Sequence, residues 1–238
     1  MSSKGRNRFD STRLHRLIAS SRVARVASIG ILAKLELVIL GGHKQVEVMR
    51  SIHAARIGRE SLLSGNEAFT VFSLARSQRS LPGVMAEVGV YQGVSARLIS
   101  QGSGGAPLHL FDTFAGLPTP DASEHSRMRE GHYAASLSSV RTFLSDCPEV
   151  FFHPGLFPDT SVPCAADRFS FVHLDVDLKS STLDCLNFFY PRMLPGGIIL
   201  SHDFSYLDGV REAFTEFFDS RPEQPIELAT SQAMLVKR

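Results

Sequence analysis

The chain contains little cysteine: Cys147, Cys164 and Cys185 are the only three among 238 residues, and they are widely separated in the sequence. Their positions offer no C-x-x-C motif, no Cys/His pairing of the kind that predicts a zinc site, and no framework of disulfides. A reducing compartment fits this usage best, so we expect a cytoplasmic protein.

Long uncharged apolar runs are also missing. The most hydrophobic stretch, residues 23–42, is interrupted by Arg25, Lys34 and Glu36, so it contains no run of the roughly 18 apolar residues that a membrane span requires. It begins too far from the N-terminus, after too many charges, to be an ordinary cleavable signal peptide. We therefore expect a buried or interfacial helix here and no transmembrane segment.

The chain has almost no net charge, and its formal value of +1 argues against a dedicated nucleic-acid binder. The charge is unevenly distributed, however: residues 1–60 hold 12 Lys and Arg against 4 Asp and Glu, whereas the remainder holds 13 against 20. A basic N-terminal segment can contact an acidic surface, a membrane face or an anionic partner. Solvated helix faces that pack on an acidic core domain explain the same asymmetry and are the simpler interpretation.

The rest of the composition is that of an ordinary globular protein, with 43% hydrophobic and 21% charged residues and a length sufficient for one large domain with an extension. Residues from about 11 to 80 read as helical, and Ser64 or Asn66 is placed to cap the helix that follows. We therefore predict a helical N-terminal extension over residues 1–64, which supplies lid or oligomer contacts, and a second domain over residues 65–238.

Short apolar runs alternate with stretches of helical character in the second domain. The runs span residues 84–90, 107–112, 149–153, 169–176 and 196–203. Sustained alternation of strands and helices predicts a parallel sheet with helices on both faces. Residues 225–238 read as two short strands around a turn, which can close the sheet as an antiparallel hairpin. The expected fold class is therefore α/β, with a doubly wound and mostly parallel sheet of seven strands.

The first predicted strand ends in a glycine-rich turn, "MAEVGVYQGVSARLI", in which Glu87, Gly89 and Gly93 precede a helix that begins at about Val94. Glycines let the backbone turn tightly and approach a ligand closely, and the helix N-terminus offers free N–H groups to a carboxylate or phosphate. The spacing departs from the G-x-G-x-x-G pattern of dinucleotide-binding turns, which argues against an NAD-dependent oxidoreductase.

The second predicted strand, "PLHLFDTF", ends in Asp112, which follows Gly93 by nineteen residues. An acidic residue about twenty positions after such a turn is well placed to accept both hydroxyls of a ribose. A carboxylate that caps the turn before "TFAGLP" is the alternative. Turn and carboxylate together indicate a ligand that contains adenosine, bound at the carboxyl ends of the first strands.

The fourth predicted strand, in "FVHLDVDL", alternates apolar residues with His173, Asp175 and Asp177, although its neighbours suggest a strand buried on both faces. The fifth ends in His202 and Asp203. Ligands bind outside the carboxyl ends of parallel strands. We therefore expect one site to contain Asp175, Asp177, His202 and Asp203. Carboxylates at close range repel one another unless a cation or a proton lies among them, and hard oxygen ligands favour Mg²⁺.

Two of these polar residues have simpler explanations. His173 is expected to form a hydrogen bond within the sheet or to a covering helix. Asp177 can cap the helix that begins near "SSTLDCLNFF", a role for which Ser180 and Ser181 compete. The remaining three polar residues at the strand ends are harder to attribute to packing.

Several stretches, in the same order, resemble the macrocin O-methyltransferase family. They are "AEVGVYQG", "LFDTFAGLP", "GLFPDT", "LDVDLKSSTLDCLNFFYPRMLPGGIILSHDF", "GVREAFTEFF" and "SQAMLVKR", and the resemblance runs from about residue 65 to the C-terminus. Members of this family are S-adenosylmethionine-dependent enzymes that methylate sugar or aglycone hydroxyls on natural products. The resemblance therefore implies a class I methyltransferase fold, which is Rossmann-like, and a small hydroxylated molecule as substrate.

The resemblance also implies roles for particular residues. It places the methionine part of the cofactor beside the glycine-rich turn, the ribose at Asp112, and the adenine or the site entrance near Gly155 and Phe157. The expected cofactor-binding residues are Glu87, Gly89, Tyr91, Gly93, Ser95, Asp112, Gly155, Phe157 and Asp175.

A metal site at Asp175, His202 and Asp203 is implied as well, with Asp175 and His202 as the expected catalytic residues. The chain departs from the family at two nearby positions, since His202 replaces an Asp and Lys179 replaces a Tyr. Histidine is a softer ligand than Mg²⁺ prefers. His202 therefore either binds Mg²⁺ or another divalent cation with the two carboxylates, or acts without metal as the general base on the substrate hydroxyl.

Three functions stay open. The first is an O-methyltransferase whose substrate enters over residues 113–133, a stretch long and polar enough to form a lid. The second is an NAD-dependent oxidoreductase, and the third is a non-catalytic protein that binds the cofactor and contacts a partner or membrane through its basic N-terminus. We also expect a homodimer or higher homo-oligomer formed by residues 11–60, because large exposed apolar patches are rare on monomers.

Overall fold

The computed structural model describes residues 22–120 and 128–238, with the backbone alone for residues 22–26. The chain divides into two compact units, Met1–Asn66 and Glu67–Arg238. Within the described residues, no helix combines the length and the apolar character that crossing a lipid bilayer requires.

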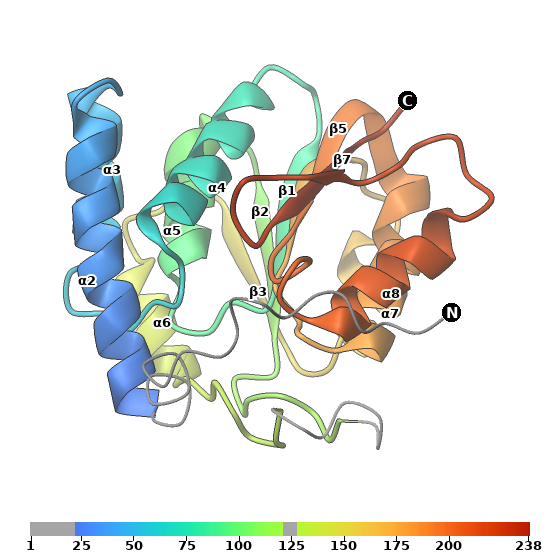
Figure 1. Cartoon of the computed structure of the whole chain (residues 1–238). Helices are drawn as coiled ribbons and strands as arrows, with labels where there is room; N and C mark the ends of the chain where they lie inside the picture. Colours follow the sequence, from blue (N-terminus) through green and yellow to red (C-terminus); the bar gives the residue numbers. More distant parts are fainter. Residues whose placement is uncertain (1–21, 121–127) are drawn as a thin grey trace, which may run out of the picture. The chain divides into compact units, whose positions relative to one another are not determined.

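The first unit contains α2 (Arg22–Gly41) and α3 (Val46–Arg56), drawn in blue in Figure 1. The apolar stretch at residues 23–42 is therefore helical, as predicted. α3 has a buried apolar face made by Val48, Met49, Ile52 and Ala55. α2 instead carries several exposed apolar side chains, among them Ile31, Leu35, Val38 and Ile39.

A seven-stranded sheet forms the centre of the second unit (Figure 1). Its strands are β1 (Val84–Val88), β2 (Leu108–Asp112), β3 (Val150–Pro154), β4 (Phe169–Leu174), β5 (Met193–Ser201), β6 (Ile226–Glu227) and β7 (Ala233–Val236). Their order in space is β3-β2-β1-β4-β5-β7-β6, and all neighbouring pairs are parallel except those that involve β7. The prediction of a doubly wound, mostly parallel sheet with an antiparallel closing hairpin is confirmed.

Helices cover both faces of this sheet. In Figure 1, α4 (Gly65–Ser77) and α5 (Val94–Ser103) lie on one face, and α7 (Lys179–Phe189) and α8 (Asp208–Phe218) lie on the other. Because the sheet is covered on both sides, every residue of β4 is buried. The short elements are α6 (Leu137–Phe143), η1 (Asp159–Cys164) and η2 (Tyr190–Arg192).

Aromatic rings fill much of the core between the sheet and α7. Phe189 of α7 stacks on Phe157 with 5.3 Å between ring centroids and meets Phe169 edge-on at 5.0 Å. Pairs in these geometries contribute about 0.5–1.5 kcal/mol each beyond the burial of their area. Phe111 of β2 also meets Phe189 edge-on at 6.2 Å, so this packing connects both β2 and β4 to α7.

The strand order reverses between β1 and β4, which is the point where open α/β sheets bind ligands beyond the carboxyl ends of their strands. β1 ends at Val88, β2 at Asp112, β4 at Leu174 and β5 at Ser201. The residues that directly follow these ends include most of those predicted for the site. The fold thus brings the predicted residues to one edge of the sheet.

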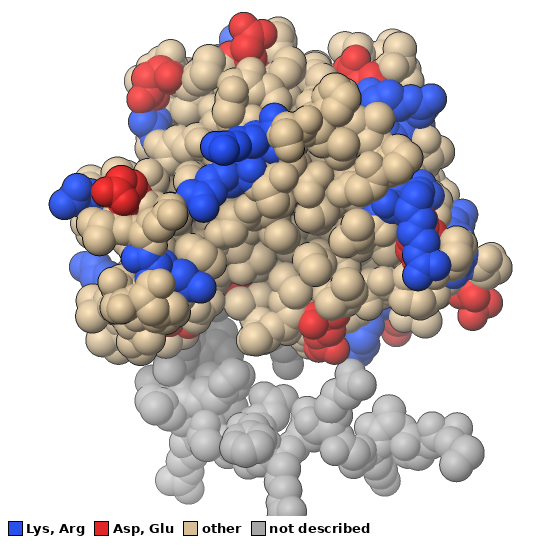
Figure 2. Space-filling model, turned by 90° about the horizontal axis from the view of Figure 1, so that it is seen from above, with Lys and Arg blue, Asp and Glu red and all other residues tan. Residues whose placement is uncertain are grey.

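Charged side chains are scattered over the face shown in Figure 2. Small groups of Lys and Arg and small groups of Asp and Glu are separated by broad uncharged areas, and neither sign dominates the described residues on this face. Part of the basic N-terminal segment, residues 1–21, lies outside the described residues. A binding role for that segment stays a prediction.

Candidate functional site

The turn after β1 approaches the end of β4 so closely that Gly89 leaves no room for a side chain. Gly89 has a φ of 87°, in the left-handed region, and a Cβ built on it would lie 1.9 Å from the carbonyl oxygen of Asp175. The N–H of Asp175 donates to the carbonyl of Val88 at 2.9 Å. The glycine-rich turn and Asp175 therefore lie directly side by side.

Tyr91, Gly93 and Ser95 occupy the connection between β1 and α5. Tyr91 has a φ of 49°, and its ring meets that of Tyr133 edge-on at 5.9 Å. Left-handed backbone in a residue other than glycine is strained and clusters at binding sites. Ser95 is buried in the first turn of α5, where it lies close enough to lower the pKa of the Glu87 carboxyl.

Asp112 lies at the end of β2 and holds two loops in place through its carboxylate. Oδ2 accepts hydrogen bonds from the N–H groups of Val90 at 2.7 Å and Tyr91 at 2.8 Å, and Oδ1 accepts from Phe114 at 2.6 Å. Burial raises the pKa of Asp112, and these backbone hydrogen bonds oppose the rise. Oδ1 keeps one further lone pair, whereas both lone pairs of Oδ2 are used, so the turn-capping role leaves one acceptor position for a ribose hydroxyl.

Glu87 and His173 form a buried pair inside the sheet. They are neighbours across β1 and β4, and His173 Nδ1 lies 2.8 Å from Glu87 Oε1. Both side chains are fully buried. Burial raises the pKa of Glu87, while the hydrogen bond and the electrostatic interaction with His173 lower it. His173 thus forms its hydrogen bond within the sheet, as predicted.

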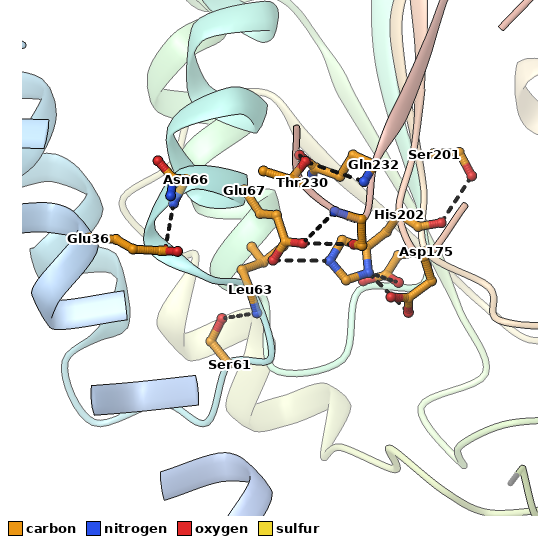
Figure 3. Close-up of polar contacts among 12 residues, drawn as sticks. Glu36, Ser61, Leu63, Asn66, Glu67, Asp175, Ser201, His202, Thr230 and Gln232 are labelled. Carbon is orange, nitrogen blue, oxygen red and sulfur yellow. Dashed lines mark hydrogen bonds and ion pairs between the residues drawn. The ribbon is translucent and has the colours of Figure 1, made fainter. Parts of the chain in front are cut away.

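Asp175, His202 and Asp203 come together just beyond β4 and β5. His202 Nδ1 lies 3.3 Å from Asp175 Oδ1 and 3.1 Å from Asp203 Oδ2. One possible ligand atom from each residue lies within 4.8 Å of the others. The imidazole is buried, and Figure 3 shows it between Asp175 on one side and Glu67 on the other.

The charged groups of this cluster shift one another's pKa values. Burial lowers the pKa of His202, but the carboxylates of Asp203 and Asp175 more than offset this and raise it well above its ordinary value. Burial likewise disfavours ionisation of Asp175, yet His202 holds the pKa of Asp175 below its ordinary value. Without a bound cation the raised pKa favours a protonated imidazole, whose single positive charge offsets part of the negative charge of the carboxylates.

Asp177 belongs to this acidic cluster and not to the helix that follows it. α7 begins at Lys179 with Leu178 at its N-cap, so the alternative in which Asp177 caps this helix is wrong. Burial raises the pKa of Asp177 well above its ordinary value, and the nearby charges of Asp203 and Asp175 raise it further. Asp177 and Asp203 both have left-handed backbone, with φ of 60° and 55°.

Glu67 completes the surroundings of His202, and reasoning from the sequence did not find it. Its Oε2 lies 3.6 Å from His202 Nε2 (Figure 3). Its Oε1 accepts a hydrogen bond from the Ser231 hydroxyl at 2.7 Å. The available signal was an acidic residue in the first turn of α4, which the helix dipole favours in any helix. Only its burial in the folded chain marks Glu67 as part of a site.

The other predicted residues are placed by the loop after β3 and by α7. Gly155 donates its N–H to the carbonyl of Asp112 at 2.9 Å, so it lies next to the end of β2. Phe157 is buried, and its ring packs edge-on against Phe111 at 5.2 Å. Lys179 Nζ lies 3.1 Å from Glu216 Oε2 on α8, an ion pair at the surface.

The predicted lid over residues 113–133 is described only in part, because residues 121–127 lie outside the described residues. Its two described ends are joined, since Leu117 donates its N–H to the carbonyl of His132 at 2.8 Å and Gly131 donates to the carbonyl of Leu117 at 3.0 Å. Tyr133 connects this base to the ring of Tyr91. Opening and closing of the segment stays a prediction.

Residues 57–232 match the family described as Macrocin-O-methyltransferase (TylF). The chain belongs to the macrocin O-methyltransferase family. The match includes the glycine-rich turn, Asp112 and the cluster of Asp175, His202 and Asp203. It begins just after α3, so α2 and α3 lie outside the matched residues.

Two curated proteins illustrate the relationship. The chain is 32% identical over 155 residues to 8-demethyl-8-(2,3-dimethoxy-alpha-L-rhamnosyl)-tetracenomycin-C 4'-O-methyltransferase of Streptomyces olivaceus, covering 58% of each chain. It is 28% identical over 158 residues to mycinamicin III 3''-O-methyltransferase of Micromonospora griseorubida, covering 58% of this chain and 61% of that protein. The chain thus spans less than two thirds of the length of each relative.

Solved structures share the fold. The O-methyltransferase NovP superposes with a TM-score of 0.65 at 21% identity, covering 88% of this chain and 99% of that one. The calicheamicin methyltransferase CalS11 also superposes with a TM-score of 0.65 at 15% identity, covering 95% of this chain and 93% of that one. The O-methyltransferase TomG of Streptomyces achromogenes, solved in complex with SAM, superposes with a TM-score of 0.55 at 14% identity, covering 84% of this chain and 95% of that one. The expected Rossmann-like methyltransferase fold is therefore confirmed.

Proposed function

We propose that this chain is an S-adenosylmethionine-dependent O-methyltransferase that acts on a hydroxyl of a sugar or of another natural product. The observation that carries the proposal is the cluster of Asp175, His202 and Asp203 at the switch point of a methyltransferase-type sheet. Membership of the macrocin O-methyltransferase family supports the reaction. The rhamnosyl group in the name of the Streptomyces olivaceus relative supports a sugar hydroxyl as the acceptor.

In this proposal, residues just outside the ends of β1 and β2 form the binding site of the cofactor. Gly89 and Gly93 keep the turn free of side chains, and the N-terminus of α5 directly follows it. Asp112 offers the remaining lone pair of Oδ1 to a ribose hydroxyl. When bound, S-adenosylmethionine supplies an electrophilic methyl group on its sulfonium sulfur. Holding the acceptor oxygen in line with that methyl group provides a large part of the rate.

Asp175, His202 and Asp203 also fit a divalent cation. Two carboxylates and one imidazole converge, and neither ring nitrogen of His202 forms a hydrogen bond of good geometry although both are buried. A mixed oxygen and nitrogen set suits a divalent ion softer than Mg²⁺. When bound, such a cation lowers the pKa of the acceptor hydroxyl. A metal-free base is the weaker choice, because Asp175 and Asp203 keep the proton on His202.

The proposed activity is tested by incubating the purified chain with methyl-labelled S-adenosylmethionine and two sets of acceptors. One set consists of glycosylated natural products with free sugar hydroxyls, and the other consists of the corresponding aglycones. We expect label on a single oxygen of one acceptor. Binding of S-adenosylmethionine without transfer to any acceptor would favour the non-catalytic alternative, and absence of cofactor binding would overturn the proposal.

Replacement of Asp112 by Ala is expected to weaken binding of S-adenosylhomocysteine by about 2–3 kcal/mol, because a charged acceptor of hydrogen bonds is lost. Asp112→Asn should lose less, since the amide keeps one acceptor oxygen for the N–H groups of Val90 and Tyr91. Calorimetric titration measures both, and the melting temperature reports damage to the loops. Unchanged affinity in Asp112→Ala would remove this residue from the cofactor site.

We also expect a homodimer that forms through α2. Val38 on this helix is 76% exposed, and Ile39 is 68% exposed. Val38→Glu should therefore shift the protein towards monomer in sedimentation experiments at micromolar concentration. Val162→Glu is the matched control, because Val162 is also 76% exposed but lies on η1. A wild-type protein that sediments as a monomer would contradict this prediction.

A further inference from the structure

Three side chains that bind metals in many proteins converge at a second place in the chain. They are His109 of β2, His153 of β3 and Cys164, the last residue of η1. His109 Nδ1 lies 2.9 Å from His153 Nε2 and 3.0 Å from Cys164 Sγ, and the last two atoms are 3.8 Å apart. Ligand atoms around a tetrahedral zinc ion with ordinary bond lengths are about 3.3–3.6 Å apart.

The register of β2 and β3 places both imidazoles on the same face of the sheet. His109 is paired with Phe151, and His153 is paired with Phe111 two residues further along. Each imidazole stacks on the phenyl ring opposite, with centroids 5.2 Å apart for His109 and 4.6 Å for His153. Both rings are therefore held in position by the sheet and do not have to move far to meet a ligand.

Hydrogen bonds among these three side chains do not satisfy all of their polar atoms. A neutral imidazole has one N–H donor and one acceptor nitrogen, so His109 Nδ1 can offer a single lone pair although it faces both His153 and Cys164. Asp167 Oδ2 lies 3.6 Å from the other ring nitrogen, His109 Nε2. This carboxylate favours a proton on Nε2, which directs the lone pair of Nδ1 into the cluster, as in carboxylate–histidine–zinc arrangements.

We propose that His109, His153 and Cys164 form a binding site for zinc or a chemically similar transition metal, with Asp167 orienting His109. A thiolate with two imidazoles selects such an ion over Mg²⁺ or Ca²⁺. The fourth position is left for water. This site is separate from the cluster of the proposed methyltransferase function, because its ligands come from β2, β3 and η1 and not from the ends of β4 and β5.

The proposed site differs from the expectation that no Cys/His pairing in the sequence offers a zinc site. His153 follows His109 by 44 residues and precedes Cys164 by 11, a spacing that matches no zinc motif. The ion would connect β3, which lies at the edge of the sheet, and η1 to the more central strand β2. Its role would therefore be structural: it would fasten the sheet edge beside the strand that carries Asp112.

The test uses the full-length chain freed of metal with a chelator and then titrated with Co²⁺, which reports its ligands by absorption. A thiolate ligand gives a charge-transfer band in the near ultraviolet, and tetrahedral geometry gives strong visible bands. We expect both at one equivalent of Co²⁺ and their loss on addition of Zn²⁺. A parallel titration of Asp175→Asn should give the same bands, because the carboxylate cluster contains no thiolate.

Cys164→Ala should abolish the charge-transfer band, whereas Cys185→Ala, which removes another buried cysteine, should keep it. His153→Ala retains the buried thiol and should weaken metal binding at least tenfold. Asp167→Asn should weaken it by about 10–100-fold, the range found for carboxylates that orient a ligating histidine. Zn²⁺ should also raise the melting temperature of the wild type and of Cys185→Ala, but not of His153→Ala.

Two results would overturn the proposal. One is a wild-type chain that shows no thiolate band with Co²⁺ and no thermal shift with Zn²⁺. The other is a band of full intensity in both Cys164→Ala and His153→Ala, which would place the metal elsewhere. Neither outcome depends on methyl transfer, so a failure of the zinc site and a failure of the proposed enzymatic function are distinguishable.

Discussion

Asp175→Asn and His202→Ala are each expected to lower the turnover number for methyl transfer by roughly two orders of magnitude or more, the scale of losing acid–base assistance. The two side chains lie 3.3 Å apart and share one proton or one cation, so the loss of either disrupts the same unit. Initial rates with the identified acceptor measure the effect. Asp219→Asn, at an exposed aspartate beyond α8, should keep wild-type activity.

A chelator separates the two ways in which this cluster can act. If a cation is bound, the chelator should abolish methyl transfer and a divalent ion should restore it, while cofactor binding persists. If His202 acts alone as a base, the chelator should have no effect, and the rate should fall as the pH drops through the pKa of His202, which the two carboxylates raise. Near wild-type rates in both Asp175→Asn and His202→Ala would mean that the chemistry lies elsewhere.

His202→Asp provides a sharper test of the metal. It exchanges the imidazole for a third carboxylate and removes the positive charge that His202 contributes between Asp175 and Asp203. Oxygen-only ligands favour Mg²⁺, so the ion preference should shift towards Mg²⁺ and dependence on added metal should increase. If the variant is active and neither chelator nor added metal changes its rate of methyl transfer, a metal role for this position would be excluded.

Gly89→Ala is expected to cause the largest loss of stability of any single methyl addition in the turn. The new Cβ would lie 1.9 Å from the carbonyl oxygen of Asp175, and the backbone at φ 87° disfavours a side chain in any case. We expect a decrease of at least about 4 kcal/mol in the free energy of unfolding, a value that marks a severe lesion. Urea denaturation measures it.

Gly105→Ala is the matched control for this effect. Gly105 has a similar φ of 93°, but nothing lies within 4 Å of a Cβ added there. It should therefore lose only about 1–2 kcal/mol, the cost of left-handed backbone in an alanine. Equal losses in the two variants would show that the contact between Gly89 and Asp175 is unimportant. If Gly89→Ala does not accumulate while Gly105→Ala does, the prediction is supported in its strongest form.

The sequence predicted the sheet well because strand and helix periodicities alternate clearly along the second unit. The order of the strands then follows from general rules for parallel sheets, and with it the meeting of Asp175, His202 and Asp203 at one edge. Helix starts were less accessible. α4 begins at Gly65, so Asn66, one of two proposed caps, lies inside its first turn, where its N–H donates to Glu36 Oε2 at 3.1 Å.

Contacts between distant elements could not be predicted from local patterns. Glu67 reaches His202 across 135 positions of the chain, and only the packing of α4 on the sheet brings the two together. The sequence gives no signal that connects His109 with His153, since nothing local reveals that β2 and β3 pair in the register that aligns them. Such sites depend on which residues face each other, and short motifs do not encode that.

The edge position of β3 affects how readily the protein aggregates. An edge strand offers unpaired backbone groups to another chain, and the sequence "VFFHP" joins apolar, strand-forming residues of which Phe151 is 43% exposed. The strand is only five residues long and ends at Pro154, which has no N–H to donate. We therefore expect Glu149, directly before β3, and Pro154, at its end, to limit the addition of a strand from a second molecule.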